Sequence, residues 1–169
     1  MSDSEWTTIG ELTVRHRMSV SDTSFFYDEP IILPVARGGY ALSVRKVTFD
    51  GHEHAMAIRA VRSDKPTARG RVVGEVSVGF GQVGICDRDE VEKAFDALGD
   101  AGMSTYFDQL NSTDLTGWIT LPGSVKMAMV RPGFGDGTYP IFELQDADGD
   151  AAGIEIDCSL PTANMPSDR

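Results

Sequence analysis

The sequence is poor in cysteine and contains no long apolar run. Its 169 residues include two cysteines, Cys86 and Cys158, and neither belongs to a Cys-x-x-Cys pair or to a zinc-binding spacing. No apolar run approaches the ~18 residues of a membrane-spanning helix, and the first residues lack the basic and apolar regions of a secretory signal. We therefore expect a cytoplasmic protein with no membrane partner and with two buried, reduced thiols. A disulfide or a reactive thiol is the alternative.

Basic residues are also scarce. The chain has 26 Asp and Glu against 15 Lys and Arg, which gives a formal net charge of −11. A nucleic-acid binder needs clustered Lys and Arg to contact phosphates, and the only compact basic cluster is Arg15-His16-Arg17. The composition therefore argues against a nucleic-acid partner, although a high net charge also favours solubility alone.

Recognisable catalytic patterns are missing as well. No serine occupies a Gly-x-Ser-x-Gly turn, and His16 has no identifiable nucleophile partner. Residues 79–84 match Gly-x-Gly-x-x-Gly, but a dinucleotide site requires the helix to start within that motif. The pattern predicts that Ile85 and Cys86 are extended and that the helix cap comes only at Asp87. We therefore interpret residues 79–84 as a bent hairpin, and we predict no catalytic residue and no cofactor.

Alternation of apolar and polar residues dominates what is present. This period of two is typical of half-buried strands. It predicts strands in residues 10–20, 31–33, 40–49, 55–61, 72–78, 85–86, 118–121, 125–130, 139–144 and 153–158. We therefore predict an α+β protein that is mainly β, an antiparallel β-sandwich or open barrel. Residues 1–160 are expected to form one globular domain, and residues 161–169 a disordered tail.

Helical spacing is confined to the second half of the chain. Asp87 and Glu90 form a capping arrangement similar in logic to a capping box, apolar residues follow at helical spacing, and Gly99 is placed where a helix ends. A second short helix is predicted over residues 104–110. One or two short helices are therefore expected to be inserted in the second half.

The chain also repeats itself. Gly10-Glu-Leu-Thr-Val14 is echoed by Gly74-Glu-Val-Ser-Val78, and Met18-x-Val-x-Asp22 is echoed by Val83-x-Ile-x-Asp87. Each copy is followed by an apolar segment, proline and glycine, and a hairpin that contains Asp-Gly, which is Asp50-Gly51 in the first copy. These echoes predict a pseudo-twofold arrangement of two units, residues 7–63 and 72–160; the alternative is chance similarity among short strands.

A glycine-rich loop, Gly133-Phe-Gly-Asp-Gly-Thr-Tyr-Pro140, is the most distinctive stretch. Three glycines predict a sharply bent backbone, and Pro140 predicts that the loop leads into a strand. Successive glycine amides can form an anion-binding nest, although the Asp136 carboxylate would repel an anion and can instead accept hydrogen bonds from its own turn. We name four candidate ligand-binding residues at this loop and at the similar Gly79-Phe-Gly81 bend: Asp136, Tyr139, Gln82 and Asp87.

Two metal-like patterns are weaker. Asp146-x-Asp148-x-Asp150 resembles the start of a calcium loop, but Ala151 stands where that loop requires glycine, and strands are expected on both sides. His52 and His54 lie on one face of an extended turn without a third ligand. We interpret both as polar turns and predict no metal site.

Two segments together resemble an uncharacterised bacterial family, a domain of unknown function. Residues 78–87 look like its recurrent Gly-Gln segment, which closes on an aspartate before a helix. Residues 133–142, followed by the strand Ile154-Glu-Ile-Asp157, look like its Gly-Asp-Gly-x-Tyr-Pro segment and its terminal strand. The chain departs from the family where Gly79-Phe80 replace Asp-Ser and where Phe142 replaces Tyr. The resemblance implies no activity, but it marks the two loops as a matched pair.

These features predict a non-enzymatic binding or protein-interaction module, immunity-like or regulatory, whose partner is another protein. The alternative is a small-molecule or metal-dependent enzyme whose site lies between the two Gly-Phe-Gly loops. The oligomeric state is left open.

Overall fold

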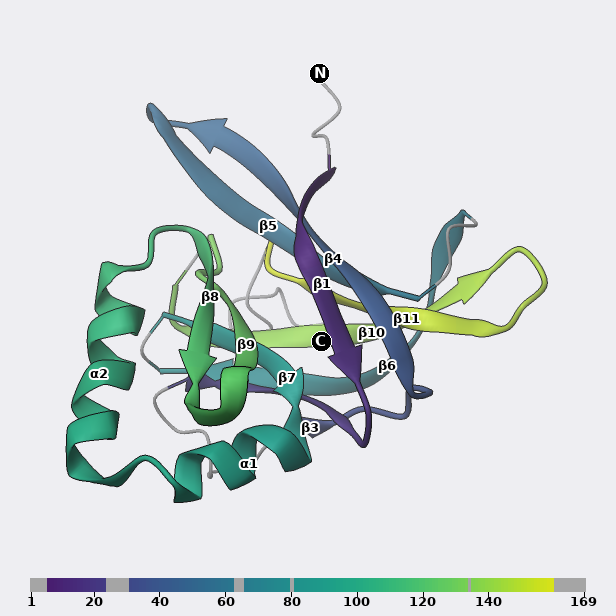
Figure 1. Cartoon of the computed structure of the whole chain (residues 1–169). Helices are drawn as coiled ribbons and strands as arrows, with labels where there is room; N and C mark the ends of the chain where they lie inside the picture. Colours follow the sequence, from purple (N-terminus) through teal and green to yellow (C-terminus); the bar gives the residue numbers. More distant parts are fainter. Residues whose placement is uncertain (1–5, 24–30, 63–65, 80, 134, 160–169) are drawn as a thin grey trace.

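The computed structural model describes residues 6–23, 31–62, 66–79, 81–133 and 135–159, and it shows two packed antiparallel sheets with two helices (Figure 1). The predicted tail, residues 161–169, lies outside these ranges. Neither sheet closes into a barrel within the described residues. The predicted fold class, α+β and mainly β with an antiparallel sandwich, is confirmed.

Among the described residues, the larger sheet, sheet A, has six strands and the smaller, sheet B, has five. Sheet A has the order β1 (Trp6–Val14), β4 (Gly38–Phe49), β5 (His52–Val61), β11 (Ala151–Asp157), β10 (Gly137–Asp146) and β6 (Thr67–Val78). Sheet B has the order β3 (Ile31–Ile32), β2 (Met18–Asp22), β7 (Val83–Asp87), β9 (Val125–Val130) and β8 (Thr116–Leu121). Because β6 and β7 belong to different sheets, residues 79–82 connect the two sheets. The predicted bent hairpin at this position is therefore wrong.

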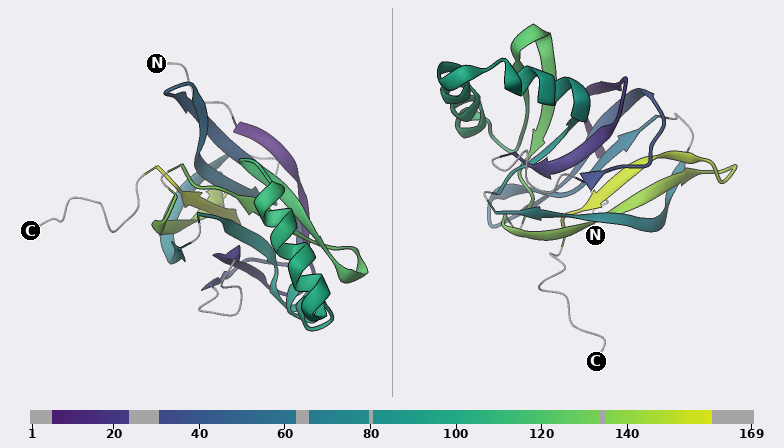
Figure 2. Two further views of the ribbon diagram at one scale, coloured as in Figure 1. Left: turned by 90° about the vertical axis from the view of Figure 1, so that its left-hand side faces the viewer. Right: turned by 90° about the horizontal axis from the view of Figure 1, so that it is seen from below.

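Sheet B is covered on both faces. One face packs against sheet A through a core that includes Val20, Ile85, Leu42 and Ile154. The other face packs against α1 (Arg88–Asp96) and α2 (Gly99–Ser112) through a second cluster that includes Tyr106 (Figure 2). Two-sided burial explains why all five residues of β2, and all five of β7, are buried.

The predicted cap of the first helix is confirmed, but the predicted boundary at Gly99 is wrong. Asp87 Oδ1 accepts a hydrogen bond from Glu90 N at 3.4 Å. The helix ends at Asp96, and Gly99 instead begins α2, which is longer than predicted. Gly99 has φ of +65°, a conformation that glycine adopts at little cost, and this allows the chain to turn sharply between two helices.

No described helix is long and apolar enough to cross a bilayer.

The strand order of each sheet is internally symmetric. From one edge to the centre, sheet A has the order β1, β4, β5. From the other edge to the centre it has the order β6, β10, β11, so these strands correspond in pairs. In sheet B, β2 and β3 correspond in the same way to β7 and β9, while β8 and both helices are additions to the second unit. A pseudo-twofold axis therefore passes between β5 and β11 and between β2 and β7.

Equivalent residues also make equivalent contacts. Tyr40 lies opposite Leu12, and Tyr139 lies opposite the corresponding Val76. Each tyrosine hydroxyl donates to the carbonyl four residues earlier, Tyr40 to Ala36 at 2.5 Å and Tyr139 to Gly135 at 2.7 Å. The two units therefore share local geometry as well as topology.

In each unit, an aspartate side chain also accepts a hydrogen bond from the connecting turn of the other unit. Asp22, at the end of β2, accepts a hydrogen bond from Gly79 N at 2.6 Å, directly after β6. The equivalent Asp87, at the end of β7, accepts from Arg15 N at 2.7 Å, directly after β1. These reciprocal bonds connect both sheets and both units.

Both cysteines are buried and reduced within the described structure. Burial raises the pKa of Cys86 to about 12, despite a partly opposing hydrogen-bonding contact with Ser19, and burial also raises the pKa of Cys158.

Since the thiolate is the reactive form, we expect native protein at pH 8 to react with a thiol reagent such as DTNB about a thousandfold more slowly than urea-unfolded protein. Rapid labelling of folded protein would contradict this expectation.

Candidate functional site

The structure brings the two predicted loops together. Gly137 pairs with Val78, so the loop before β10 lies beside the turn after β6. A methyl group added at Gly81 would come within 3.9 Å of Asp136 Oδ1. The two loops are therefore adjacent in the structure, and Asp136 is exposed at their surface.

The other three candidate residues have structural partners. Gln82 is buried; its Oε1 accepts from Thr23 Oγ1 at 3.0 Å and its Nε2 donates to Leu110 O at 3.0 Å. Tyr139 is buried in the core, and burial raises its pKa to about 12, so its hydroxyl remains a donor to Gly135. Asp87 lies at the far end of β7 from the loops, where it binds backbone N–H groups of Arg15 and His16.

A cavity of about 400 Å³ adjoins the loop pair. Gly79, Gly137 and Thr138 contribute to its lining, together with Asp22 and Glu75. None of the four predicted side chains is among its described lining residues. The predicted loops are therefore adjacent to a cavity, but the side chains predicted to bind a ligand do not converge there.

Asp146, Asp148 and Asp150 gather at the tip of the β10–β11 hairpin, with ligand atoms within 4.8 Å of one another. Asp146 Oδ1 accepts hydrogen bonds from Asp148 N at 2.9 Å and from Asp150 N at 3.1 Å. These bonds are those of a polar turn that is stabilised by its own aspartate.

The richest polar arrangement lies on the outer face of sheet A. Val44, Ile58 and Ile154 belong to the core, so their neighbours on the strands point to the opposite, outer face. We call this outer surface the arginine face. It comprises three arginines, two aromatic rings and two carboxylates: Arg45, Arg59, Arg69, Trp6, Phe142, Glu155 and Asp157.

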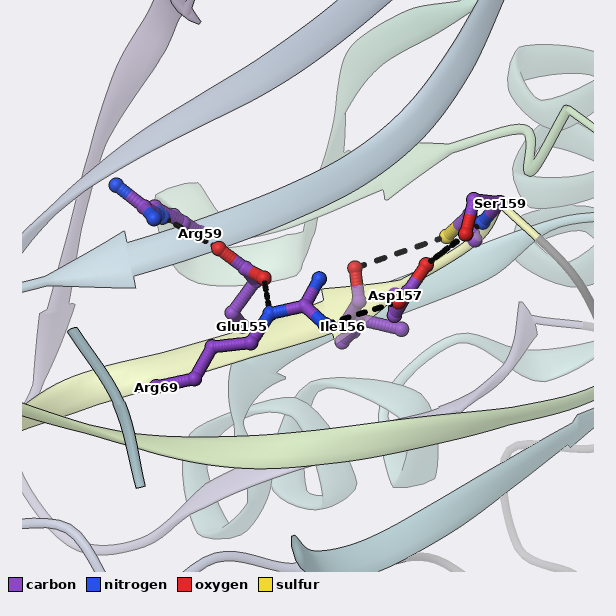
Figure 3. Close-up of polar contacts among 7 residues, drawn as sticks. Arg59, Arg69, Glu155, Ile156, Asp157 and Ser159 are labelled. Atoms are coloured by element: carbon purple, nitrogen blue, oxygen red, sulfur yellow. Dashed lines mark hydrogen bonds and ion pairs between the residues drawn. The ribbon is translucent and has the colours of Figure 1, made fainter. Parts of the chain in front are cut away.

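Glu155 organises this face. It is 2% exposed, and its two oxygens accept from Arg59 Nε at 2.6 Å and from Arg69 Nε (Figure 3). Arg69 also bonds Asp157 at 3.0 Å. Burial opposes ionisation of Asp157, but hydrogen bonds from Ser159 and the Arg69 guanidinium outweigh it and lower the pKa of Asp157.

Each anchored arginine also stacks on an aromatic ring. The Arg59 Cζ lies 4.3 Å from the ring centroid of Trp6, and the Arg69 Cζ lies 4.5 Å from that of Phe142. Such cation–π contacts and the shared carboxylate restrict the side chains to one orientation. The face is therefore preorganised rather than a set of freely moving surface charges.

Not every donor on this face is used. Arg59 and Arg69 engage Glu155 through Nε, and among the described residues the two terminal nitrogens of Arg59 have no hydrogen-bond acceptor. The Nε of Arg45 is buried and also has no partner among the described residues. Although the chain as a whole carries −11, three arginines lie beside two carboxylates within this face. Its chemistry is that of binding an anionic group, since arginine provides only donors.

The sequence contains no pattern from which this face could be located. Arg59 and Glu155 are 96 residues apart, and they meet only because β5 pairs with β11 in one particular register. The outward alternation of Arg45 with Val44, and of Arg59 with Ile58, is visible in the sequence, but the strand order is not.

Loss of the Glu155 charge should destabilise the fold. We expect Glu155→Gln to lower the free energy of unfolding by about 2 kcal/mol, because two neighbouring guanidinium groups would lose their buried counter-charge. Urea denaturation followed by circular dichroism measures this change. Glu143→Gln is the matched control, because its pair with Arg71 is long, at 4.0 Å, and should contribute less than about 1 kcal/mol. Equal effects of the two substitutions would contradict the role of Glu155.

A scan against protein-family models, a search of curated proteins and a search of solved structures each returned no match. The family resemblance noted in the sequence therefore stays a prediction.

Proposed function

We propose that the protein is a non-enzymatic interaction module that binds another protein through the arginine face. The observation that carries this proposal is the Arg59–Trp6 stack, fixed from beneath by the buried carboxylate of Glu155. Trp and Arg are the residues that most often dominate the energy of protein interfaces, and preorganised side chains lose little entropy on binding. The face is built on paired strands, which provide a rigid support.

The alternative, an enzyme with a site between the glycine loops, is less well supported by the geometry. Of its four candidate side chains, Gln82, Tyr139 and Asp87 are held in hydrogen bonds that stabilise the fold. An exposed Asp136 alone does not form an acid–base pair. An interaction surface needs no such pair.

Site-specific photo-crosslinking tests the proposal. The photoreactive residue p-benzoylphenylalanine is placed at position 142, on the arginine face, or at position 107, where Phe107 is 40% exposed on α2 at the opposite side of the sandwich. We expect defined protein adducts from position 142 in cells of the source organism and none from position 107. Adducts from position 107 only, or equally from both positions, would overturn the proposal.

A further inference from the structure

We infer that Arg45 and Arg59, beside Trp6, form a carboxylate-binding site that receives an acidic side chain of the partner. This inference rests on the proposed function and specifies the chemistry of its partner. Trp6 lies directly opposite Arg45 across the β1–β4 pair, and its ring stacks on Arg59. Arg45 in turn lies opposite Ala57, two residues from Arg59 on the same face of β5. The two arginines and the indole therefore form one continuous group.

Two independent observations indicate an absent acceptor. The Arg45 Nε is buried without a hydrogen-bond partner among the described residues. Buried donors in folded proteins are nearly always satisfied, so the hydrogen-bonding capacity of the Arg45 guanidinium is incompletely used in this structure; because the side chain as a whole is only half-buried, an incoming carboxylate would meet its terminal nitrogens rather than the enclosed Nε. Separately, Glu155 engages Arg59 only through Nε, which leaves its two terminal nitrogens without an acceptor among the described residues. Those two nitrogens form the planar fork that matches a carboxylate.

The charge of the chain favours an acidic protein segment over a polyanion. The site is formed by two arginines, but it belongs to a chain with a net charge of −11. Nucleic acids and anionic membranes need extended basic surfaces, and such a surface is not formed by a few arginines interleaved with Glu155 and Asp157. Carboxylates on a partner fit the two available arginines, and a short acidic segment covers far less surface than a nucleic acid or a membrane.

Fluorescence anisotropy with a fluorescein-labelled hexaglutamate peptide tests this inference on the full chain. We expect saturable binding that weakens as NaCl is raised from about 50 to about 300 mM. Arg45→Gln and Arg59→Gln should each weaken binding about tenfold or more, since each removes a charge-assisted contact. Arg37→Gln is the control, because it removes the same charge from an exposed loop between β3 and β4.

Each outcome is decisive. No binding of hexaglutamate, or an equal loss in the Arg37 control, would overturn the inference, as would tighter binding of an oligothymidylate of similar charge. If Arg59→Gln fails to fold, Arg59→Lys keeps the charge but not the planar fork and should still lose most of the binding. Adducts at position 142 without hexaglutamate binding would leave the proposed function standing and remove only the carboxylate site. Binding of hexaglutamate at Arg45 and Arg59 without adducts at position 142 would leave the carboxylate site standing and overturn the proposed function.

Discussion

Gly153→Ala should prevent the protein from folding or should lower its free energy of unfolding by at least about 4 kcal/mol. Gly153 lies on β11 with φ of +153°, opposite Val61 of β5. A Cβ atom there would overlap the carbonyl oxygen of Ala60 and would lie 3.0 Å from its carbonyl carbon and 3.1 Å from the Val61 Cα. These are backbone atoms in the middle of sheet A, so the clash cannot be relieved by rotating a side chain.

Gly149→Ala is the matched control, because Gly149 also has a positive φ, +84°, and lies at the tip of the same hairpin. Nothing lies within 4 Å of a Cβ added there. Its cost should be the conformational one alone, about 1–2 kcal/mol. Soluble expression and urea denaturation of both variants measure the difference. Similar stabilities of the two variants would show that β11 is not packed against β5 as described.

Asp87→Ala should lower the free energy of unfolding by about 3 kcal/mol, because it removes acceptors from three backbone N–H groups at once. Asp87 accepts from Arg15 N at 2.7 Å and His16 N at 3.0 Å in the β1–β2 turn, and from Glu90 N at the start of α1. For a domain of this size the loss corresponds to a decrease in Tm of about 6–12 °C. Differential scanning calorimetry measures it.

Asp89→Ala is the control for Asp87→Ala, since it removes the same charge two residues away. Asp89 bonds Arg17 at 2.7 Å in an exposed pair, and solvent screens such pairs, so little change in Tm is expected. The equivalent Asp22→Ala should destabilise in the same direction as Asp87→Ala, and the two losses should add because the sites lie at opposite ends of β2 and β7. A loss from Asp87→Ala no larger than that from Asp89→Ala would contradict the reciprocal arrangement.

Local features of the sequence were sufficient to predict much of the fold. Alternation located the strands, Asp50-Gly51 predicted the β4–β5 hairpin, in which both residues have positive φ, and Asp87 with Glu90 predicted the start of α1. The echo between residues 10–22 and 74–87 falls on β1–β2 and on β6–β7, which hold equivalent places in the strand order. These features are readable because each depends on residues close in the chain or on a comparison of two short segments.

The arginine face and the second role of Asp87 could not be predicted in this way. The cap on Glu90 spans three residues, but the bond from Arg15 to Asp87 spans 72. The Arg59–Glu155 pair likewise depends on the register between β5 and β11. The sequence motifs pointed to the glycine-rich loops as the binding site, but most of the side chains named there stabilise the fold. The charged side chains of the arginine face lie on strands and come together only when the chain folds.

The position of the Arg59–Glu155 pair has a further consequence. Matching Tyr40 with Tyr139 along β4 and β10 makes Arg59 the counterpart of Glu155, and these two residues lie directly opposite each other on the pseudo-twofold axis. In a homodimer of two identical half-length chains, a residue on the axis would meet its own copy, so arginine would face arginine or glutamate would face glutamate. A single covalent chain removes that restriction, because its halves can diverge at the axis. Opposite charges can therefore face each other at this point in a single chain, but not in a symmetric dimer of two identical half-length chains.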